Sequence, residues 1–390
     1  MKYTFVFSFV LIGLFFTAAC SNDTNSNKKK NKRVKDAQQE EPVFNPLTDA
    51  QKNYYQLEIQ KKFDSLFPGE TFNGEILIAK NGEILFEKYQ GYHDFKNKTP
   101  ITENTPLHVA SVSKPLTGAA ILKLYEEDKL SLDDSVQVYI RDFPYHGITI
   151  RNLLSHRSGL PNYLYFMDKD WDKKRMASNQ DIINFMIEQK VPRTASPDRA
   201  FQYCNTNYIL LALIVEKITG MDFPTYMKKN IFEPLGMNNT YVFSKIDSAH
   251  YIETYSVSKP FPMDHYDCSY GDKNVYTTVR DLLKWDNVLY TGDFLKPQTI
   301  ALSYQALSHE RPSIHNYGLG WRMINSPAGD TVIYHNGFWH GTNAVFTRFV
   351  QDTAVVIIIG NKQNRNIYKG KEFGNIFSKQ ENYEIANPLE

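Results

Sequence analysis

A serine and a lysine three residues apart form the first pair of side chains that could do chemistry. They are Ser111 and Lys114, in the stretch HVASVSKPLTGAA over residues 108–120. Positions i and i+3 are neighbours on one side of a helix. A serine hydroxyl needs a base to become a good nucleophile, and a lysine can be that base only when its amine is neutral. Burial and a helix N-terminus both favour the neutral amine.

Taken alone, this Ser-x-x-Lys pair is weak evidence, because a helix cap followed by a surface lysine would give the same pattern. Pro115 supports a helix start, since proline is tolerated in a first turn. Proline also disfavours helical geometry in the residue before it, so we expect backbone strain at Lys114.

Two further motifs strengthen the case for chemistry. FQYCNTNY over 201–208 places Tyr203 and Asn205 at the start of an apolar, helix-like segment. YHNG over 334–337 places His335 and Gly337 at the end of a β-like run. Cys204, between Tyr203 and Asn205, is expected to be a small buried filler.

The elements that must position these residues alternate in type along the chain. Residues 50–66 have helical spacing, and GEILIAKNGEILFEKY reads as two strands joined at Asn81-Gly82, a strong hairpin signal. The helix that carries Lys114 should run to about Lys129. Residues 150–300 are mostly helical in pattern, strands return between 317 and 360, and a helix could follow near the C-terminus. Strands at both ends predict an α+β fold with one sheet built from both chain ends and a mainly helical lobe over roughly 150–300.

The first twenty residues have the composition of an export signal. Lys2 precedes the apolar run FVFSFVLIGLFF, and TAAC ends at Cys20, as in a bacterial lipoprotein whose mature chain starts at a lipidated cysteine. An ordinary secretory signal and a retained membrane span are the alternatives, although six basic residues from 28 to 35 would give such a span the wrong orientation. Residues 21–48 are polar and read as a disordered tether to a folded domain over 49–390.

Composition limits the remaining possibilities. The chain has 390 residues, of which 42% are hydrophobic, enough for one large core or two adjoining ones. A net charge of +1 gives no support for nucleic acid as a partner. Three cysteines cannot form a disulfide framework for a chain of this size, so stability must come from the core.

The three motifs, in this order, resemble the serine β-lactamase and penicillin-binding protein superfamily. The branch that contains class C β-lactamases, related esterases and D-amino-acid peptidases is the most similar. LLSHRSGLP at 153–161, EPLGM at 233–237 and YGLGW at 317–321 also fit that branch. The resemblance covers roughly 70–390 and implies a β-lactamase/transpeptidase-like fold, with an antiparallel sheet flanked by helices.

The resemblance also implies a role for each matching residue. Ser111 would attack a carbonyl and form an acyl-enzyme, while Lys114 accepts its proton or holds the network in place. Tyr203 would pass a proton to the leaving group and help activate water. Asn205 would donate to a substrate carbonyl. The backbone N–H groups of Ser111 and Phe338 would form the oxyanion hole.

Gly337 would let the strand backbone approach the substrate without a side chain in the way. His335 stands where lactamases usually have lysine. A mostly neutral histidine would bind a carboxylate less firmly, which favours esterase or peptidase-like activity over an efficient β-lactamase. No metal or cofactor is implied.

The expected partner is a small molecule or peptide with a reactive carbonyl. An apolar acyl pocket could draw on a set of aromatic residues, although core packing would explain each of them equally well: Tyr163, Tyr165, Phe166, Trp171, Phe338 and Trp339. The expected location is the bacterial cell envelope, with a membrane anchor through lipid on Cys20. The alternative is a tethered, non-catalytic protein that binds cell-wall peptides or a protein partner.

Overall fold

The computed structural model describes residues 44–257, 259–326 and 329–377, which belong to one compact unit. The predicted export signal, Cys20 and the predicted tether up to residue 43 lie outside the described residues. Within the described part of the chain, no helix combines the length and the apolar character that crossing a bilayer would require.

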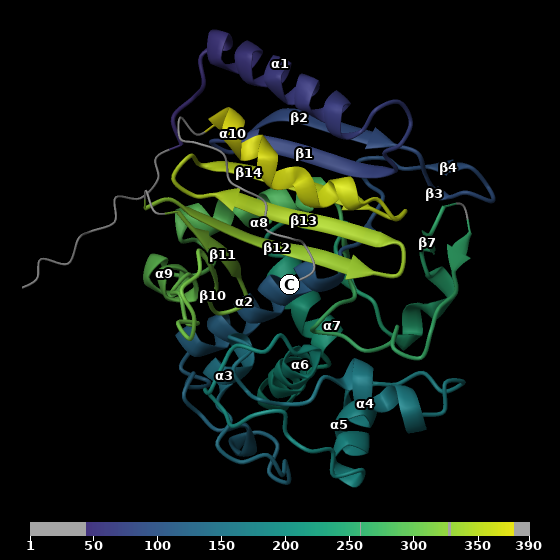
Figure 1. Ribbon diagram of the computed structural model, residues 1–390, viewed down its shortest axis with the longest axis vertical. Helices are drawn as coiled ribbons and strands as arrows, with labels where there is room; N and C mark the ends of the chain where they lie inside the picture. Colours follow the sequence, from purple (N-terminus) through teal and green to yellow (C-terminus); the bar gives the residue numbers. More distant parts are fainter. Residues whose placement is uncertain (1–43, 258, 327–328, 378–390) are drawn as a thin grey trace, which may run out of the picture. The chain divides into compact units, whose positions relative to one another are not determined.

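A seven-stranded antiparallel sheet is the largest element of the fold (Figure 1), and its strand order is β10-β11-β12-β13-β14-β1-β2. The strands are β1 (Gly74–Lys80), β2 (Glu83–Gln90), β10 (His315–Tyr317), β11 (Arg322–Asn325), β12 (Thr331–Trp339), β13 (Thr342–Phe349) and β14 (Ala354–Gly360). Pairing of β1 with β14 joins the two ends of the chain, from Gly74 opposite Gly360 to Lys80 opposite Ala354. The α+β class and the sheet built from both chain ends are therefore confirmed.

The hairpin between β1 and β2 has the turn that its sequence predicts. Asn81 and Gly82 have φ angles of 53° and 73°, the left-handed conformation that both central residues of a type I′ turn require.

Both faces of the sheet are covered, which explains the uninterrupted apolar run of β14. Val356 and Ile358 face a core formed with α1 (Asp49–Leu66) and the C-terminal helical segments η5 (Arg365–Phe373) and α10 (Gly374–Phe377). Ile357 and Ile359 face the larger core on the other side, which includes α8 (Val279–Thr291). In Figure 1, η5 and α10 cross the sheet on the side opposite α8.

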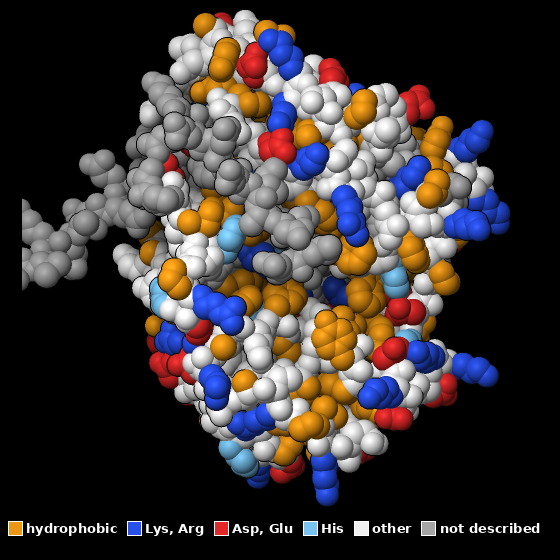
Figure 2. Space-filling view, in the orientation of Figure 1, with side chains coloured by type: hydrophobic (Ala, Val, Ile, Leu, Met, Phe, Trp, Pro, Cys, Tyr) orange, Lys and Arg blue, Asp and Glu red, His pale blue; other side chains and the backbone are white. Residues whose placement is uncertain are grey.

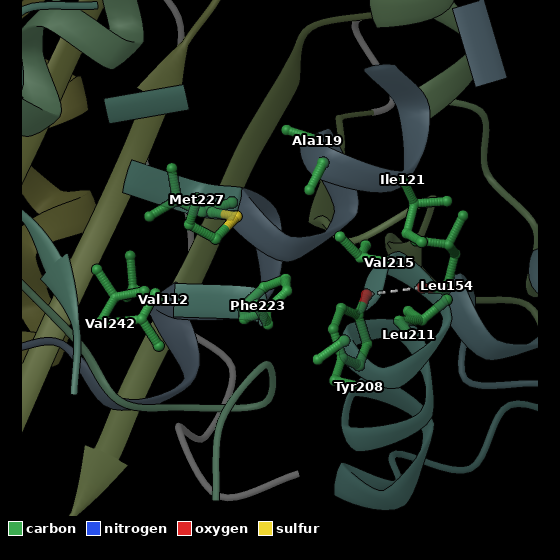
Figure 3. Close-up of a cluster of buried hydrophobic side chains, with 14 of the residues drawn as sticks. Val112, Ala119, Ile121, Leu154, Tyr208, Leu211, Val215, Phe223, Met227 and Val242 are labelled. Carbon is green, nitrogen blue, oxygen red and sulfur yellow. Dashed lines mark hydrogen bonds between the residues drawn. The ribbon is translucent and has the colours of Figure 1, made fainter. Parts of the chain in front are cut away.

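Several of the remaining helices pack around α6 (Asn205–Thr219), which is buried along most of its length, as its apolar sequence predicts. Its Tyr208 hydroxyl donates to the Leu154 carbonyl at 2.9 Å, beside the apolar side chains of α2 (Ser113–Glu126) (Figure 3). The other helical elements are η1 (Ala110–Val112), η2 (Val136–Val138), α3 (Ile150–Leu154), α4 (Tyr163–Asp170), α5 (Asn179–Glu188), α7 (Phe223–Met227), η3 (Lys228–Phe232), η4 (Lys245–His250) and α9 (Pro297–Ser303).

The segment over 150–300 is less uniform than its sequence pattern. It contains the short strands β6 (Tyr241–Val242), β7 (Thr254–Tyr255), β8 (Pro260–Phe261) and β9 (Val275–Thr277), and its helix α8 packs against β1 and β14 of the main sheet. Three further short strands precede α2: β3 (Tyr92–Asp94), β4 (Thr99–Pro100) and β5 (Leu107–His108). Strand β9 pairs with β5, and β5 leads directly into η1, where Ser111 lies.

Candidate active site

Ser111 lies in η1, the single 3₁₀ turn that precedes α2. The residue before it, Ala110, has a φ angle of 48°, a left-handed conformation that costs a non-glycine residue on the order of 1–3 kcal/mol. The strain expected at Lys114 is therefore found at Ala110, while Lys114 is helical. The Ser113 hydroxyl supports this turn, because it donates to the Ala110 carbonyl at 2.7 Å and accepts from the Val275 N–H at 3.0 Å.

The side chain of Lys114 is fully buried and reaches Ser111, as the i, i+3 spacing predicts. Its Nζ donates to Ser111 Oγ at 3.0 Å and to the Asp272 carbonyl at 2.8 Å. It also lies 4.9 Å from the ring centre of Tyr203. This burial excludes the alternative in which Lys114 is an exposed residue after a helix cap.

Tyr203 and Asn205 flank the N-cap of α6, and His156 supports this corner. The His156 ring lies 4.3 Å from the Tyr203 ring, and its Nδ1 accepts from the Cys204 N–H at 3.1 Å. Burial first, and then the nearby Lys114, hold the pKa of His156 well below its ordinary value, so the ring is neutral at pH 7. Burial raises the pKa of the Cys204 thiol to about 11, which agrees with its expected role as a filler.

Gly337 lets strand β12 lie directly against η1. A Cβ atom at this position would lie 2.2 Å from the Val109 carbonyl oxygen, so any other residue would push the strand away. Strand β11 pairs with β12 only over residues 331–334, so the part of β12 that carries Gly337 and Phe338 extends beyond β11. Both Ser111 and Phe338, whose N–H groups form the predicted oxyanion hole, line the same pocket.

His335 is buried behind this pocket and is not among the described residues that line it. Its Nδ1 is 2.8 Å from the Asn336 carbonyl and its Nε2 is 3.2 Å from the Tyr317 hydroxyl. A neutral ring satisfies both contacts by donating from Nδ1 and accepting at Nε2. Burial first, then Arg322 and Lys114, keep the pKa of His335 well below its ordinary value.

The pocket over Ser111 has a volume of about 510 Å³. The described residues that line it include two arginines and no Asp or Glu: Ser111, Asn162, Leu164, Tyr165, Tyr203, Asn205, Arg322, Asn336, Gly337, Phe338, Asn343, Arg365 and Tyr368. Of the six aromatic residues considered for an acyl pocket, only Tyr165 and Phe338 are in this set, and both are largely exposed. Figure 2 shows the face of the molecule that is turned to the viewer in Figure 1. Apolar side chains gather near its middle, and acidic and basic side chains are scattered around them.

Sequence reasoning missed both arginines. Arg322 begins β11, and its guanidinium carbon lies 5.1 Å from the Tyr203 ring centre. Arg365 begins η5, which follows β14, the last strand of the sheet in the chain. The YGLGW segment ends one residue before Arg322, and this adjacency was the only signal in the sequence that could have drawn attention to it.

Comparison with known proteins agrees with this geometry. A family model described as Beta-lactamase matches residues 70–378. Penicillin-binding protein 4* of Bacillus subtilis is 32% identical over 328 residues, which cover 80% of this chain and 73% of that protein.

Solved structures share the fold at lower sequence identity. A penicillin-binding protein from Bacillus halodurans superposes with a TM-score of 0.70 at 23% identity, covering 80% of this chain and 98% of that one. D-amino acid amidase from Ochrobactrum anthropi gives 0.64 at 21%, covering 84% and 98%. EstCE1, a hydrolase with promiscuous acyltransferase activity, gives 0.67 at 20%, covering 84% and 98%.

Proposed function

The chain belongs to the β-lactamase family, whose members are serine hydrolases, and we propose that it hydrolyses an ester, amide or lactam carbonyl through an acyl-enzyme at Ser111. The observation that carries this proposal is the 3.0 Å contact between the buried amine of Lys114 and the Ser111 hydroxyl, at the edge of a 510 Å³ pocket. A protein that only bound peptides would not need a buried lysine aimed at a serine.

In the proposed reaction, Ser111 Oγ attacks the substrate carbonyl carbon. Its proton passes to Lys114 or, through that amine, to Tyr203. The negative oxygen of the tetrahedral intermediate accepts from the backbone N–H groups of Ser111 and Phe338. Collapse of the intermediate breaks the bond to the leaving group, which takes the proton from Tyr203. Water then attacks the acyl-enzyme carbonyl carbon and gives a proton to Tyr203. Collapse of this second intermediate breaks the bond to Ser111 Oγ, which takes a proton back from Lys114, and releases the acid.

The substrate class follows from the pocket. Arg322 and Arg365 are the charged side chains among the described residues that line the pocket, so we favour an ester or peptide that carries a carboxylate. This differs from the weaker carboxylate binding that His335 predicted, because His335 is not among the described residues that line the pocket. Relatives described as a penicillin-binding protein, an amidase and a hydrolase support carbonyl chemistry of this general kind. Export to the cell envelope and lipidation at Cys20 remain part of the proposal.

A fluorophosphonate probe tests the nucleophile, because it phosphonylates activated serines. The native protein should be labelled, with the adduct on Ser111, and Ser111→Ala should abolish labelling. Ser196→Ala, at an exposed serine, is the control and should label like the native protein. Labelling that persists in Ser111→Ala would place the nucleophile elsewhere, and an unlabelled native protein would favour the binding protein. In fractionated cells, the label should be in the membrane fraction and become soluble in Cys20→Ala.

A further inference from the structure

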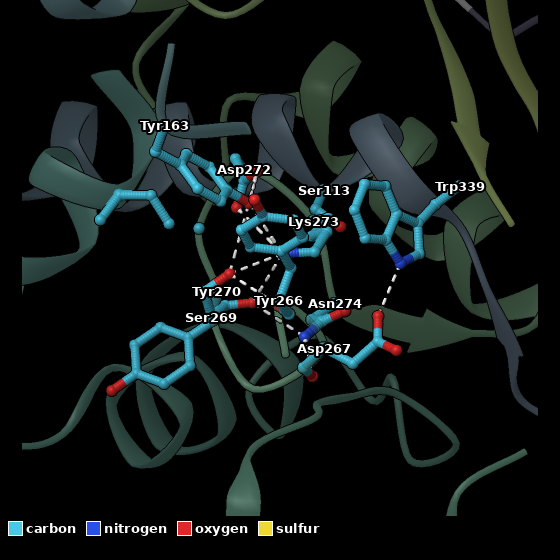
Figure 4. Close-up of polar contacts among 12 residues, drawn as sticks. Ser113, Tyr163, Tyr266, Asp267, Ser269, Tyr270, Asp272, Lys273, Asn274 and Trp339 are labelled. Atoms are coloured by element: carbon cyan, nitrogen blue, oxygen red, sulfur yellow. Dashed lines mark hydrogen bonds and ion pairs between the residues drawn. The ribbon is translucent and has the colours of Figure 1, made fainter. Parts of the chain in front are cut away.

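Lys273 is a second buried lysine near the site, and the mechanism above does not use it. Only 3% of it is exposed. Its Nζ donates to Ser269 Oγ at 2.6 Å and to the Tyr163 hydroxyl at 2.9 Å (Figure 4). It also lies 5.0 Å from the ring centre of Trp339. An ammonium group is costly to bury, and the contacts around it show that it has a fixed place.

The neighbouring residue, Asp272, joins this cluster to the catalytic lysine. Its backbone carbonyl accepts from Lys114 Nζ, while its side chain Oδ2 accepts from the Tyr163 hydroxyl at 2.9 Å. Its other oxygen, Oδ1, lies 3.9 Å from Lys273 Nζ and has no hydrogen-bond partner within the described residues. Burial, and then the Asp272 carboxylate, raise the pKa of Tyr163 well above its ordinary value, so the phenol stays protonated and donates to Asp272.

The same segment of chain also reaches the strand that carries Gly337. Trp339, two residues further along β12, donates from its indole N–H to Asp267 Oδ1 at 2.6 Å. The Asn274 amide ties the segment together by donating to the carbonyls of Asp267 and Ser269 at 2.7 and 2.8 Å. Figure 4 shows Lys273 between Asp272, whose carbonyl accepts from Lys114, and Trp339 at the end of β12.

We propose that Lys273 is a positioning residue that fixes the Asp272 backbone, and through its carbonyl the amine of Lys114. This inference rests on the proposed function, because it assigns the amine a catalytic task. Replacement of a buried ion pair by apolar residues often leaves stability unchanged, so stability alone gives little reason for a lysine here. A cation in contact with Ser269, Tyr163 and Asp272 holds the backbone carbonyl of Asp272 in one orientation. An apolar side chain in its place would not.

Lys273→Met tests the proposal, because methionine has a similar length and no charge. The rate constant for phosphonylation of the folded protein should fall about 10- to 100-fold, the usual cost of a misplaced catalytic group. Arg348→Met is the matched control. It removes another buried cation, which pairs with Asp286 of α8 near the end of β13 opposite to the pocket residue Asn343, and it should cost stability while the folded fraction keeps its rate.

Two further measurements separate positioning from general damage. In a Lys114→Ala background, Lys273→Met should cause no additional loss of rate, since the group that it positions is absent. A crystal structure of Lys273→Met should show the Lys114 amine moved out of hydrogen-bonding distance of the Asp272 carbonyl. A rate within twofold of native, a loss that persists without Lys114, or an unmoved amine would each overturn the proposal. If the native protein is not labelled at all, the proposed function fails, and the crystal structure alone decides the position of Lys114.

Discussion

At the scale of single residues, burial decides which basic side chain can meet a substrate. His335 is 1% exposed and neutral, and both of its ring nitrogens are within hydrogen-bonding distance of protein oxygens. Arg322 lies one strand away, opposite Tyr334, and reaches the pocket. A histidine in the position of the usual lysine therefore does not make the pocket neutral, because the positive charge comes from another residue.

This assignment predicts how substrate charge should matter. Arg322→Gln should lower kcat/KM about 10- to 100-fold for an ester that carries a carboxylate, the value of one charge-assisted hydrogen bond, and change a matched neutral ester little. His335→Gln should affect both esters equally, and Arg141→Gln, at an exposed arginine, should affect neither. Equal losses on both esters in Arg322→Gln would contradict carboxylate binding and indicate that Arg322 acts on the Tyr203 ring instead.

At the scale of elements, the site depends on how closely strand β12 approaches the turn η1. Gly337 is the contact point, and the obstacle to a larger residue there is the backbone at Val109, which cannot rotate away. The distance between the proposed oxyanion-hole N–H of Phe338 and the proposed nucleophile Ser111 is therefore set by the absence of one side chain.

Gly337→Ala should separate these two elements and leave most of the sheet intact. Labelling by the fluorophosphonate should fall at least about 100-fold, because a shift near 1 Å is enough to misalign reacting groups. Gly118→Ala is the matched control, since a Cβ atom there would meet the Leu319 carbonyl at an ordinary 3.4 Å, and alanine suits the interior of α2. A Gly337→Ala protein that reacts at the native rate would show that the strand does not form the oxyanion hole.

At the scale of the whole molecule, sequence reasoning succeeded where the signal was local. The Asn81-Gly82 turn, the apolar α6 and the i, i+3 pair each follow from a few neighbouring residues. Arg322, Lys273 and Asp272 could not be found in this way, because their importance depends on contacts with residues far away in sequence. Lys114 and Asp272, for example, are 158 residues apart. Spacing could place Lys114 beside Ser111, but no pattern indicated which carbonyl would hold the amine on its other side.

Glu75 gives a further test of how distant parts of the chain are joined. It is fully buried on β1, and its Oε2 accepts from the N–H of Val279, the first residue of α8, at 3.1 Å. Its Oε1 has no partner within the described residues. Burial raises the pKa of this carboxyl well above its ordinary value of 4.5, so the folded protein holds the proton more tightly than the unfolded chain does.

The sign of the pH dependence follows from this difference in pKa. The stability contributed by Glu75 is lowest above its folded pKa and grows as pH falls toward 4.5, where the unfolded chain also takes up the proton. Glu75→Gln keeps an acceptor for Val279 and removes the buried charge. It should therefore raise Tm by about 2 °C or more at pH 8, and the advantage should vanish below about pH 4. Thermal unfolding of both proteins across this range measures the difference, with exposed Glu70→Gln as a control that should show none. A lower Tm for Glu75→Gln at pH 8 would mean that the helix N-terminus of α8 stabilises the carboxylate more than burial destabilises it.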